Sequence, residues 1–166
     1  PRKNENNRLN EVGISEIASN LGVGPKLPIK PKLISYNGNN YTIIKMEKMD
    51  GTLLSLINSR NIDNETKVGL IQEAQDLLRI LHKHNICHRD LHLKNIMYKK
   101  KGNAYIVKLI DFGQSYKQCS NSHILNNTLK LTSMLNNIKR KQVRTRKPLR
   151  SIQPRYNMPQ QRVKLF

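Results

Sequence analysis

The sequence predicts a mixed α+β fold, in which a small portion with a β-hairpin precedes a mainly helical portion. Apolar residues recur at helical spacing over Leu9–Leu21 and again over Asn64–His84. Two apolar runs flank Asn37-Gly38, which is a strong hairpin signal. A further apolar run, Tyr105–Ile110, has the length and alternation of a strand. The 166 residues suffice for one domain with a real core.

The first predicted helix, Leu9–Leu21, follows a polar segment, Pro1–Arg8, that we expect to be frayed. Gly22 and Pro25 end this helix, because glycine suits the stop and proline prevents the helix from restarting. The sequence Gly22-Val23-Gly24 is not a phosphate-binding loop, since it follows a helix and lacks the Lys-Ser/Thr pair of a P-loop.

Two strands are predicted next, Lys32–Tyr36 and Tyr41–Met46, joined by a turn at Asn37–Asn40. The chain then passes through a linker that begins at Glu47 and enters a short predicted helix, Thr52–Arg60. This order places a hairpin between two helices and supports the α+β assignment.

The longest predicted helix runs from Asn64 to His84, with Asp63 as its N-terminal cap. Its apolar residues form one stripe, which predicts that this face packs against the core. The stripe consists of Val68, Ile71, Ala74, Leu77, Leu78 and Leu81. The helix delivers the chain into a loop at Asn85–Asn95.

Three side chains suited to phosphoryl transfer lie between Ile86 and Gly113. Asp90 and Asn95 are five positions apart on one loop, and Asp111 directly follows the predicted strand Tyr105–Ile110. Phosphoryl transfer needs a carboxylate near the acceptor hydroxyl and oxygen ligands that hold Mg²⁺ against nucleotide phosphates. The strand is expected to place Asp111 beside the loop, so the three side chains are expected to lie together.

The same residues carry a family resemblance. His88-Arg89-Asp90-Leu91 with Asn95, followed by Asp111-Phe112-Gly113, resembles the protein-kinase signature pair H-R-D-L-x-x-x-N and D-F-G. The resemblance covers about Glu11 to Gly113 and the helix that follows. The sequence is similar to small or atypical serine/threonine protein kinases, viral ones included, with the N-terminal part missing or reduced.

The resemblance implies a kinase-like α+β fold with a reduced N-lobe, made of a helix and a β-hairpin, and a truncated, mainly helical C-lobe. Residues 1–46 are expected to form the partial N-lobe, and residues 47–138 the hinge and C-lobe. Residues 139–166 are expected to be a basic, extended tail outside the resemblance.

The resemblance also implies ATP and Mg²⁺ as cofactors. Asp90 is expected to orient the substrate hydroxyl or accept its proton, while Asn95 and Asp111 bind the metal. His92 stands where protein kinases that modify Ser or Thr usually carry a lysine, and Lys94, two residues further on, is expected to reach the γ-phosphate.

The nucleotide base is expected to lie against the linker. Met46 would be the gatekeeper, the carbonyl of Glu47 and the amide and carbonyl of Met49 would face adenine, and Met97 would floor the pocket. The resemblance assigns Glu11 as the glutamate that pairs with the nucleotide-binding lysine.

Glu16 is the alternative to Glu11, and either residue also fits a solvated helix carboxylate. Neither a Gly-rich loop nor a V-A-I-K-like strand lysine precedes the first helix. Three explanations stay open: a fragment of a full kinase, a minimal kinase that borrows the lysine, and a pseudokinase kept for its surface.

The charge of the chain is large and uneven. There are 30 Lys and Arg against 11 Asp and Glu, a net charge of +19, and no acidic residue follows Asp111. After a predicted helix at Ser122–Ile138, the basic tail begins at Lys139. Such a field favours nucleic acid, acidic protein surfaces or anionic lipid, and the tail either binds such a polyanion or stays solvated.

The two cysteines, Cys87 and Cys119, suggest neither a disulfide framework nor a metal site, and Cys87 is expected to be a small buried apolar residue. The histidine spacing does not support one metal site either. The histidines considered are His82, His84, His88 and His92.

We expect neither a signal peptide nor a membrane span, because no apolar run in the sequence is long enough to cross a bilayer. The expected setting is a reducing interior, cytoplasmic or nuclear, or a virus particle.

The function that best fits these observations is an ATP-dependent phosphotransferase acting on protein Ser/Thr. The alternative is a catalytically impaired kinase-like scaffold whose tail binds nucleic acid or an acidic assembly such as a viral particle. A plain nucleic-acid-binding protein has only the charge in its favour and leaves both motifs unexplained. Its signature would be a steep loss of affinity with added salt.

Overall fold

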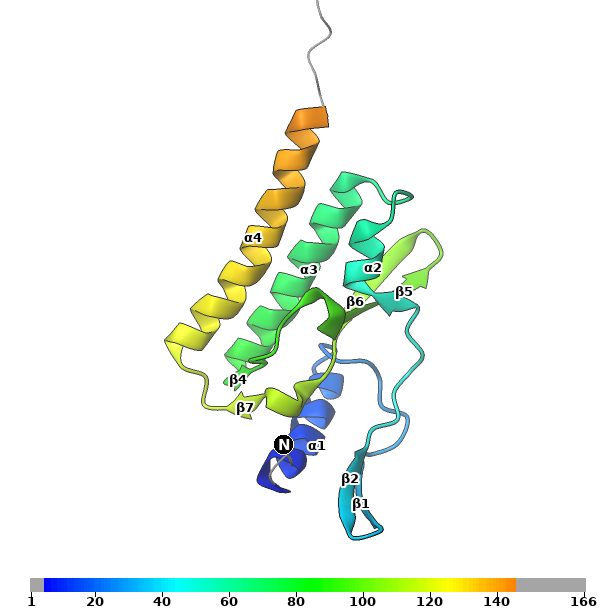
Figure 1. Cartoon of the computed structure of the whole chain (residues 1–166), viewed down its shortest axis with the longest axis vertical. Coiled ribbons are helices and arrows are strands. Elements are labelled where there is room, and N and C mark those ends of the chain that lie inside the picture. Colours follow the sequence, from blue (N-terminus) through cyan, green and yellow to red (C-terminus); the bar gives the residue numbers. More distant parts are fainter. Residues whose placement is uncertain (1–4, 146–166) are drawn as a thin grey trace, which may run out of the picture.

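The computed structural model describes residues 5–145 of the chain and confirms the predicted mixture of helices and strands (Figure 1). Long helices and a small sheet form the upper part of the view, and the first helix and the hairpin lie below them. The elements are α1 Glu5–Asn20, β1 Lys32–Tyr36, β2 Asn39–Ile43, β3 Gly51–Thr52, α2 Leu53–Asn58, α3 Asn64–Lys83, β4 Ile86–Cys87, β5 Ile96–Lys101, β6 Ala104–Leu109, β7 Tyr116–Lys117 and α4 Asn121–Thr145, with short 3₁₀ helices at Leu93–Asn95 and Phe112–Gln114.

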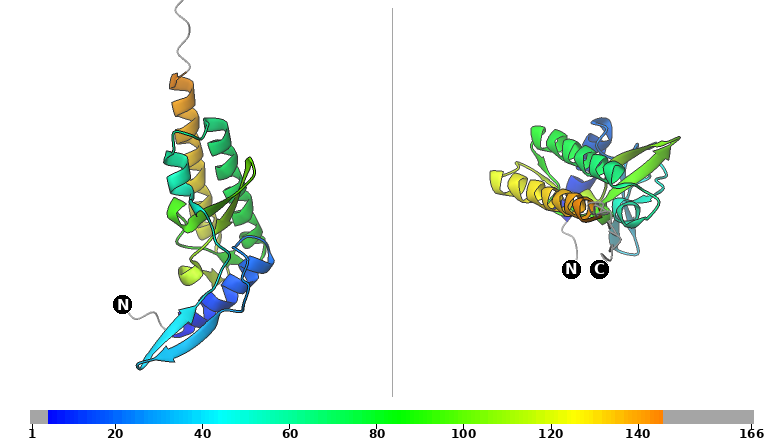
Figure 2. Two further views of the ribbon diagram at one scale, coloured as in Figure 1. Left: turned by 90° about the vertical axis from the view of Figure 1, so that its right-hand side faces the viewer. Right: turned by 90° about the horizontal axis from the view of Figure 1, so that it is seen from above.

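The core lies between α3, α4 and the sheet β3–β5–β6. Helices α3 and α4 run side by side, and β6 lies against α3 (Figures 1 and 2). Burial of large aliphatic side chains supplies most of the stabilisation, at about 25 cal/mol per Å² of apolar surface removed from water. The largest fully buried apolar side chains are Ile14, Val23, Leu53, Ile71, Leu78, Leu81, Ile86, Leu91, Ile96, Leu109 and Leu131.

Helix α3 confirms the prediction made from its cap and its apolar stripe. The carboxylate of Asp63 accepts a hydrogen bond from the amide of Thr66 at 2.7 Å and another from its hydroxyl at 2.7 Å. These bonds satisfy a donor that the first helical turn leaves without an internal partner. The helix ends at Lys83, one residue before the predicted end.

The hairpin β1–β2 is shorter and its turn tighter than predicted. Tyr36 pairs with Asn39, so the turn is the two residues Asn37 and Gly38, with φ angles of 48° and 68°. Positive φ at both positions is the requirement of a type I′ turn, which asparagine and glycine meet. The prediction of a four-residue turn is therefore wrong.

The second strand also ends earlier than the predicted Met46. Strand β2 stops at Ile43, and the linker after it has no regular structure up to Asp50. In this linker the amide of Glu47 donates to the carbonyl of Lys26 at 2.8 Å. This contact joins the linker to the segment after α1, while the ladder itself ends where Ile43 pairs with Lys32, the first residue of β1.

Helix α1 begins at Glu5, so the prediction of a frayed segment is wrong for Glu5–Arg8. Its predicted stop is confirmed. Gly22 has a φ of 70°, and the amides of Val23 and Gly24 both donate to the carbonyl of Ala18, at 2.9 and 2.8 Å. A glycine in the left-handed conformation is the usual way to satisfy the last carbonyls of a helix.

Helix α4 extends beyond its predicted end at Ile138 and continues to Thr145. The prediction of an extended tail from Lys139 is therefore wrong for residues 139–145. No glycine or proline interrupts this helix, and Leu131, Leu135 and Ile138 keep its inner face buried. The rest of the predicted tail, residues 146–166, lies outside the described residues.

Cys87 and Cys119 form a disulfide, with their Cα atoms 5.2 Å apart. The expectation of no disulfide is therefore wrong, while the expectation that Cys87 is buried is confirmed. The cysteines are 32 positions apart in the sequence. Strands β4 and β7 pair antiparallel and bring them together, and such short pairings leave no periodic signal in the sequence.

We predict that Asp63→Ala lowers the free energy of unfolding by more than a surface substitution on the same helix does, because the cap of α3 is lost. The control is Asp76→Ala on the same helix, which removes an exposed ion pair with Arg79 and is expected to change stability by less than about 0.5 kcal/mol. Urea denaturation of both variants measures the difference. Equal effects would contradict the capping role.

We predict that Glu73→Gln gains stability relative to the wild type as the pH rises from about 4 to 7. Burial raises the pKa of Glu73 above its usual value of 4.5, although the amide of Val107, which donates to its carboxylate at 3.2 Å, acts in the opposite direction. A raised pKa means that the folded chain holds this proton more tightly, so the charged carboxylate weakens the fold as the pH rises through that pKa.

Glutamine keeps an oxygen that accepts from Val107 but carries no charge. Urea denaturation of both proteins across this pH range measures the effect. A stability difference that stays constant with pH would show that the charge of Glu73 does not affect the fold.

Candidate active site

His88 anchors the start of the candidate catalytic loop. Its ring is fully buried, and its Nε2 lies 2.9 Å from the carbonyl oxygen of Ile110, to which it donates. The ring centroid lies 5.2 Å from that of Phe112. The carbonyl of His88 accepts from the hydroxyl of Ser115 at 3.1 Å. Burial lowers the pKa of His88, which favours the neutral ring, and the bond to Ile110 lets this residue support the loop.

Asn95 anchors the end of the same loop. Its carbonyl accepts from the amide of Ile110 at 2.9 Å. Both backbone polar groups of Ile110 are thus bonded to the loop, one through His88 and one through Asn95. Asp111 is the next residue in the chain, so these two bonds determine where its backbone lies relative to Asp90 and Asn95.

Asn95 is 7% exposed, and its side-chain amide nitrogen donates two hydrogen bonds. That nitrogen donates to the carbonyl of Asp90 at 3.0 Å and to its carboxylate at 3.2 Å. Within residues 5–145, no hydrogen-bond donor reaches the amide oxygen of Asn95. An amide oxygen held beside a carboxylate is a ligand of the kind that Mg²⁺ prefers.

The carboxylate of Asp90 is half-exposed, and the ring of His92 flanks it, with Nε2 3.8 Å from Oδ2. The other ring nitrogen of His92 accepts from the amide of Asn95 at 3.2 Å, so His92 caps the short 3₁₀ turn Leu93–Asn95. Lys94 lies exposed on that turn. The structure therefore brings the four predicted loop residues together, with Asp90, His92 and Lys94 accessible to solvent and Asn95 buried.

Two residues beside the candidate catalytic groups have a left-handed backbone. Arg89 has a φ of 61°, and Asp111 has φ 61° and ψ 70°. Such conformations in residues other than glycine cost of order 1–3 kcal/mol, and they persist only where the surroundings impose them. The guanidinium of Arg89 lies 5.2 Å over the ring centre of Tyr116, and Asp111 accepts from the amide of Gly113 at 3.4 Å.

A cavity of about 220 Å³ brings three of the predicted site residues together. Glu11 comes from α1, Met46 from the linker after β2, and Asp111 from the segment after β6. Glu16 lies elsewhere, at a separate hollow beside Lys30, so the arrangement favours Glu11 over its alternative. The cavity is lined by Glu11, Ser15, Gly24, Pro25, Leu27, Ile44, Met46, Ile110, Asp111 and Phe112.

Glu47 and Met49 line a second cavity, of about 280 Å³, which shares Gly24 with the first. Four lysines surround it: Lys26, Lys99, Lys101 and Lys108. The carboxylate of Glu47 accepts from the amide of Lys26 at 2.9 Å and from the ammonium of Lys99 at 2.7 Å. These contacts, the Lys26 amide first, lower the pKa of Glu47.

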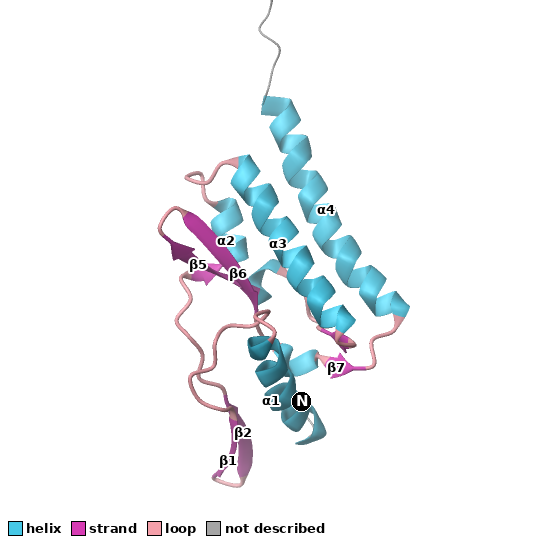
Figure 3. Ribbon diagram, turned by 180° about the vertical axis from the view of Figure 1, so that it is seen from behind, coloured by secondary structure: helices cyan, strands magenta, loops and turns pink. Residues whose placement is uncertain are grey.

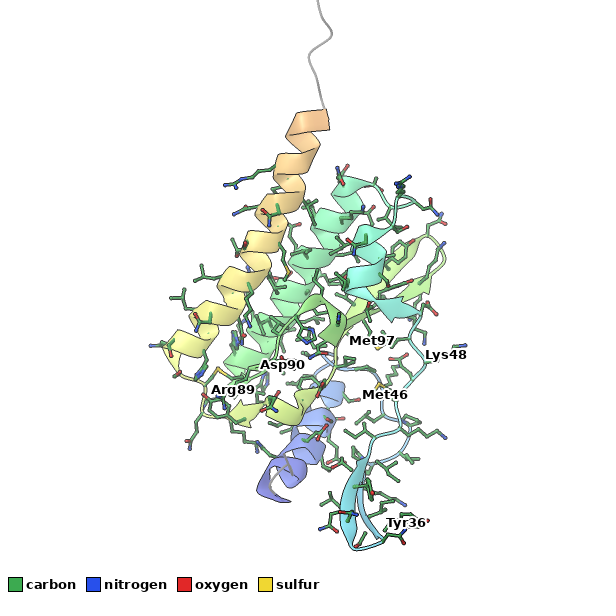
Figure 4. The ribbon with its side chains drawn as sticks, in the orientation of Figure 1. Tyr36, Met46, Lys48, Arg89, Asp90 and Met97 are labelled. Carbon is green, nitrogen blue, oxygen red and sulfur yellow. A yellow bond between two sulfur atoms is a disulfide. The ribbon has the colours of Figure 1, made fainter. Side chains whose placement is uncertain are left out.

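The backbone of the linker is only partly engaged. The amide of Asp50 donates to the carbonyl of Tyr98 at 2.9 Å, which ties the linker to β5. Among residues 5–145, no backbone hydrogen bond uses the carbonyl of Glu47 or the amide and carbonyl of Met49. Met97 is half-buried on β5, and Figure 4 labels it in the same part of the molecule as Met46. It lines neither cavity.

Several residues that shape the site were not predicted from the sequence. Ile110 acts through its backbone, and Ser115 acts through a bond to the carbonyl of His88, so neither has a signature of its own. The partners of Glu47, Lys26 and Lys99, come from segments far apart in the chain. No pattern in the sequence says which lysine of β5 meets a carboxylate.

The model of the protein kinase domain family matches residues 4–136. The chain belongs to the protein kinase family. It is 32% identical over 117 residues to a probable serine/threonine-protein kinase of Dictyostelium discoideum, a match that covers 63% of this chain and 17% of that protein. It is 36% identical over 76 residues to the protein kinase domain-containing protein ppk9 of Schizosaccharomyces pombe, covering 45% of this chain and 14% of that protein.

A third kinase, calcium-dependent protein kinase 20 of Oryza sativa subsp. japonica, is 27% identical over 110 residues, covering 63% of this chain and 20% of that protein. The match thus spans only 14% to 20% of the length of these three relatives. In the part of this kinase chain that the structure describes, every helix is too short or too polar to cross a bilayer.

We predict that Asn95→Ala destabilises the fold by about 1–3 kcal/mol, because two hydrogen bonds to Asp90, one of them to a carboxylate, are lost from a buried side chain. The neighbouring control, Lys94→Ala, removes an exposed side chain and is expected to have an effect below about 0.5 kcal/mol. Thermal and urea denaturation measure both. A loss below about 0.5 kcal/mol for Asn95→Ala would contradict the anchoring role.

Proposed function

We propose that the chain is an ATP-dependent phosphotransferase that acts on serine or threonine residues of a protein. The observation that carries this proposal is the connection of the two motifs through Ile110, which joins Asp111 to the loop of Asp90 and Asn95. A pair of solvated turns with kinase-like sequences would have no need of these bonds. Membership of the protein kinase family supports the reaction class.

Asp90 is the group that orients the acceptor hydroxyl and takes up its proton. Its accessible carboxylate and its contact with Asn95 support this role. Asn95 and Asp111 are the proposed ligands of Mg²⁺. The donor set fits a hard cation, because the nitrogen of Asn95 is committed to Asp90 and its oxygen remains, while Asp111 contributes an exposed carboxylate. When bound, the metal offsets the negative charge of the phosphates.

The adenine ring is proposed to lie against the linker, where the carbonyl of Glu47 and the backbone of Met49 have open polar groups. Met46 and Met97 supply apolar surface on the two sides. The anchored carboxylate of Glu47 holds this linker in place through Lys26 and Lys99. Glu11, in the same cavity as Asp111, is the proposed partner of a phosphate-binding lysine.

This assignment divides the chain as the sequence predicts. Residues 1–46 form the partial N-lobe, and residues 47–138 form the hinge and C-lobe. The first cavity has lining residues from both parts, which supports a nucleotide site at their boundary.

The loop itself suggests how this site handles phosphate. Since one ring nitrogen of His92 is engaged by the amide of Asn95 and the other faces Asp90, we assign His92 to positioning Asp90. Lys94 is exposed on the same turn and supplies the positive charge for the γ-phosphate. Two observations support a protein as the phosphoacceptor: membership of the protein kinase family and the similarity to the probable serine/threonine-protein kinase of Dictyostelium discoideum.

A second candidate function is a kinase-like scaffold with impaired catalysis. The net charge of +19, with no acidic residue after Asp111, favours an acidic partner. On this alternative, residues 139–166 bind nucleic acid or an acidic assembly such as a viral particle.

We predict that the wild-type chain binds Mg-ATP and that Asp111→Asn weakens this binding at least about tenfold, because a metal ligand loses its charge. Asp90→Asn is expected to retain binding but to lower the rate of phosphoryl transfer by about 10²–10⁴. Asp76→Asn, on the exposed face of α3, is the control for charge alone and is expected to change neither.

Calorimetry measures the binding of Mg-ATP. Transfer of the labelled γ-phosphate of ATP to a library of peptides, basic or of mixed charge, measures the reaction. If the wild type fails to bind Mg-ATP, the phosphotransferase proposal for this chain is wrong. Binding of nucleic acid that falls steeply with added salt would then support the scaffold.

A further inference from the structure

Three potential metal ligands come together near the end of α3, next to the strand β4 that leads into the candidate catalytic loop. His82 lies in the last turn of α3, Cys87 on β4, and Cys119 just after β7. One nitrogen of His82 and the two sulfur atoms all lie within 4.8 Å of one another. The sequence did not indicate this cluster, because β4 and β7 pair only through the tertiary fold.

The ring of His82 has a buried nitrogen, Nε2, that lacks a hydrogen-bond partner among the described residues. A buried ring nitrogen without a partner costs about 1–3 kcal/mol, and each such group in a folded protein calls for an explanation such as a bound ion or water. Cys87, fully buried, and Cys119, half-buried, are the ligand-bearing neighbours of this ring.

We propose that the reduced protein binds a zinc-class metal ion through the sulfur atoms of Cys87 and Cys119 and a ring nitrogen of His82. Two thiolates and one imidazole form a ligand set that zinc uses in proteins, with a fourth position left for water. The group contains no carboxylate, which argues against magnesium or calcium, since these ions prefer oxygen ligands. The two thiolate charges balance the charge of the divalent ion.

The disulfide and the metal exclude one another. A thiol or phosphine reductant supplies two electrons, and two protons join the sulfur atoms as the S–S bond breaks. Metal binding then displaces both protons, because the ligand form of cysteine is the thiolate. The site therefore has an oxidised form, joined by the sulfur–sulfur bond, and a reduced form that holds the ion.

Backbone contacts hold the two cysteines in place independently of their bond. The amide of Cys119 donates to the side-chain oxygen of Asn85 at 2.8 Å, and the amide of Gln118 donates to the carbonyl of Asn85 at 2.9 Å. Cys87 pairs with Tyr116 in the β4–β7 ladder. Reduction thus leaves the ligands close together, so the metal meets a largely formed site.

The test uses the full, untagged chain, reduced with a phosphine and freed of metal by a chelator that is then removed. Co²⁺ is titrated first, because its absorption reports tetrahedral thiolate ligands, and Zn²⁺ is then added. We expect one Co²⁺ per chain with thiolate-to-metal absorption bands, and loss of those bands as Zn²⁺ displaces the ion.

His82→Gln and Cys119→Ser are each expected to weaken metal affinity at least about tenfold, since loss of an outer-shell partner alone costs 10–100-fold. His84→Gln is the matched control, because His84 lies exposed at the same helix end, and it is expected to keep the wild-type affinity. Circular dichroism of the metal-free variants checks that they are folded. Absorption bands that never form, or that persist undiminished in both ligand variants, would overturn the proposal.

A second measurement needs no variant. The reaction of the two cysteines with a thiol reagent is followed in the reduced wild type, with and without Zn²⁺. Slower modification of both thiols with zinc supports the site, and equal rates would overturn it.

Discussion

The amide of Ile110 donates to the carbonyl of Asn95, while its carbonyl accepts from the buried ring of His88. These two bonds join the end of β6 to both ends of the loop that carries Asp90. Because they act on the residue before Asp111, they set the relation between the two motifs without any contact between their acidic side chains. Two further contacts support the same junction: the ring of His88 packs on Phe112, and the hydroxyl of Ser115 donates to the carbonyl of His88.

The elements around this junction have separate tasks. Figure 3 shows that helices make up most of the upper body, with the sheet at its edge and α1 beneath. Helix α3 and strand β6 form the base from which the loop and Asp111 emerge, and α1 brings Glu11 to the same cavity. The hairpin β1–β2 stands apart, with nearly all its residues exposed, so packing contributes little to its stability and the Asn37-Gly38 turn contributes more.

The sequence indicated the features that depend on neighbouring residues. The cap at Asp63 and the apolar stripe identified α3, and the two motifs identified Asp90, Asn95 and Asp111. Features made by distant segments were missed. The second strand was predicted to reach Met46, but it ends at Ile43, which pairs with Lys32, the first residue of β1. Pro31, before Lys32, has no amide hydrogen that could continue the ladder. The disulfide was missed because only the β4–β7 pairing brings its cysteines together.

The left-handed backbone at Arg89 and Asp111 lowers the stability of the fold, but the side chains at these two positions belong to the candidate site. Glycine adopts this conformation without penalty, so glycine at either position would relieve the local strain. At Arg89 it would also remove the stacking on Tyr116, and at Asp111 the carboxylate itself. Selection for a more stable fold alone would therefore favour replacement of Arg89 and Asp111 by glycine. Selection for a working site would keep both side chains despite the strain in their backbone.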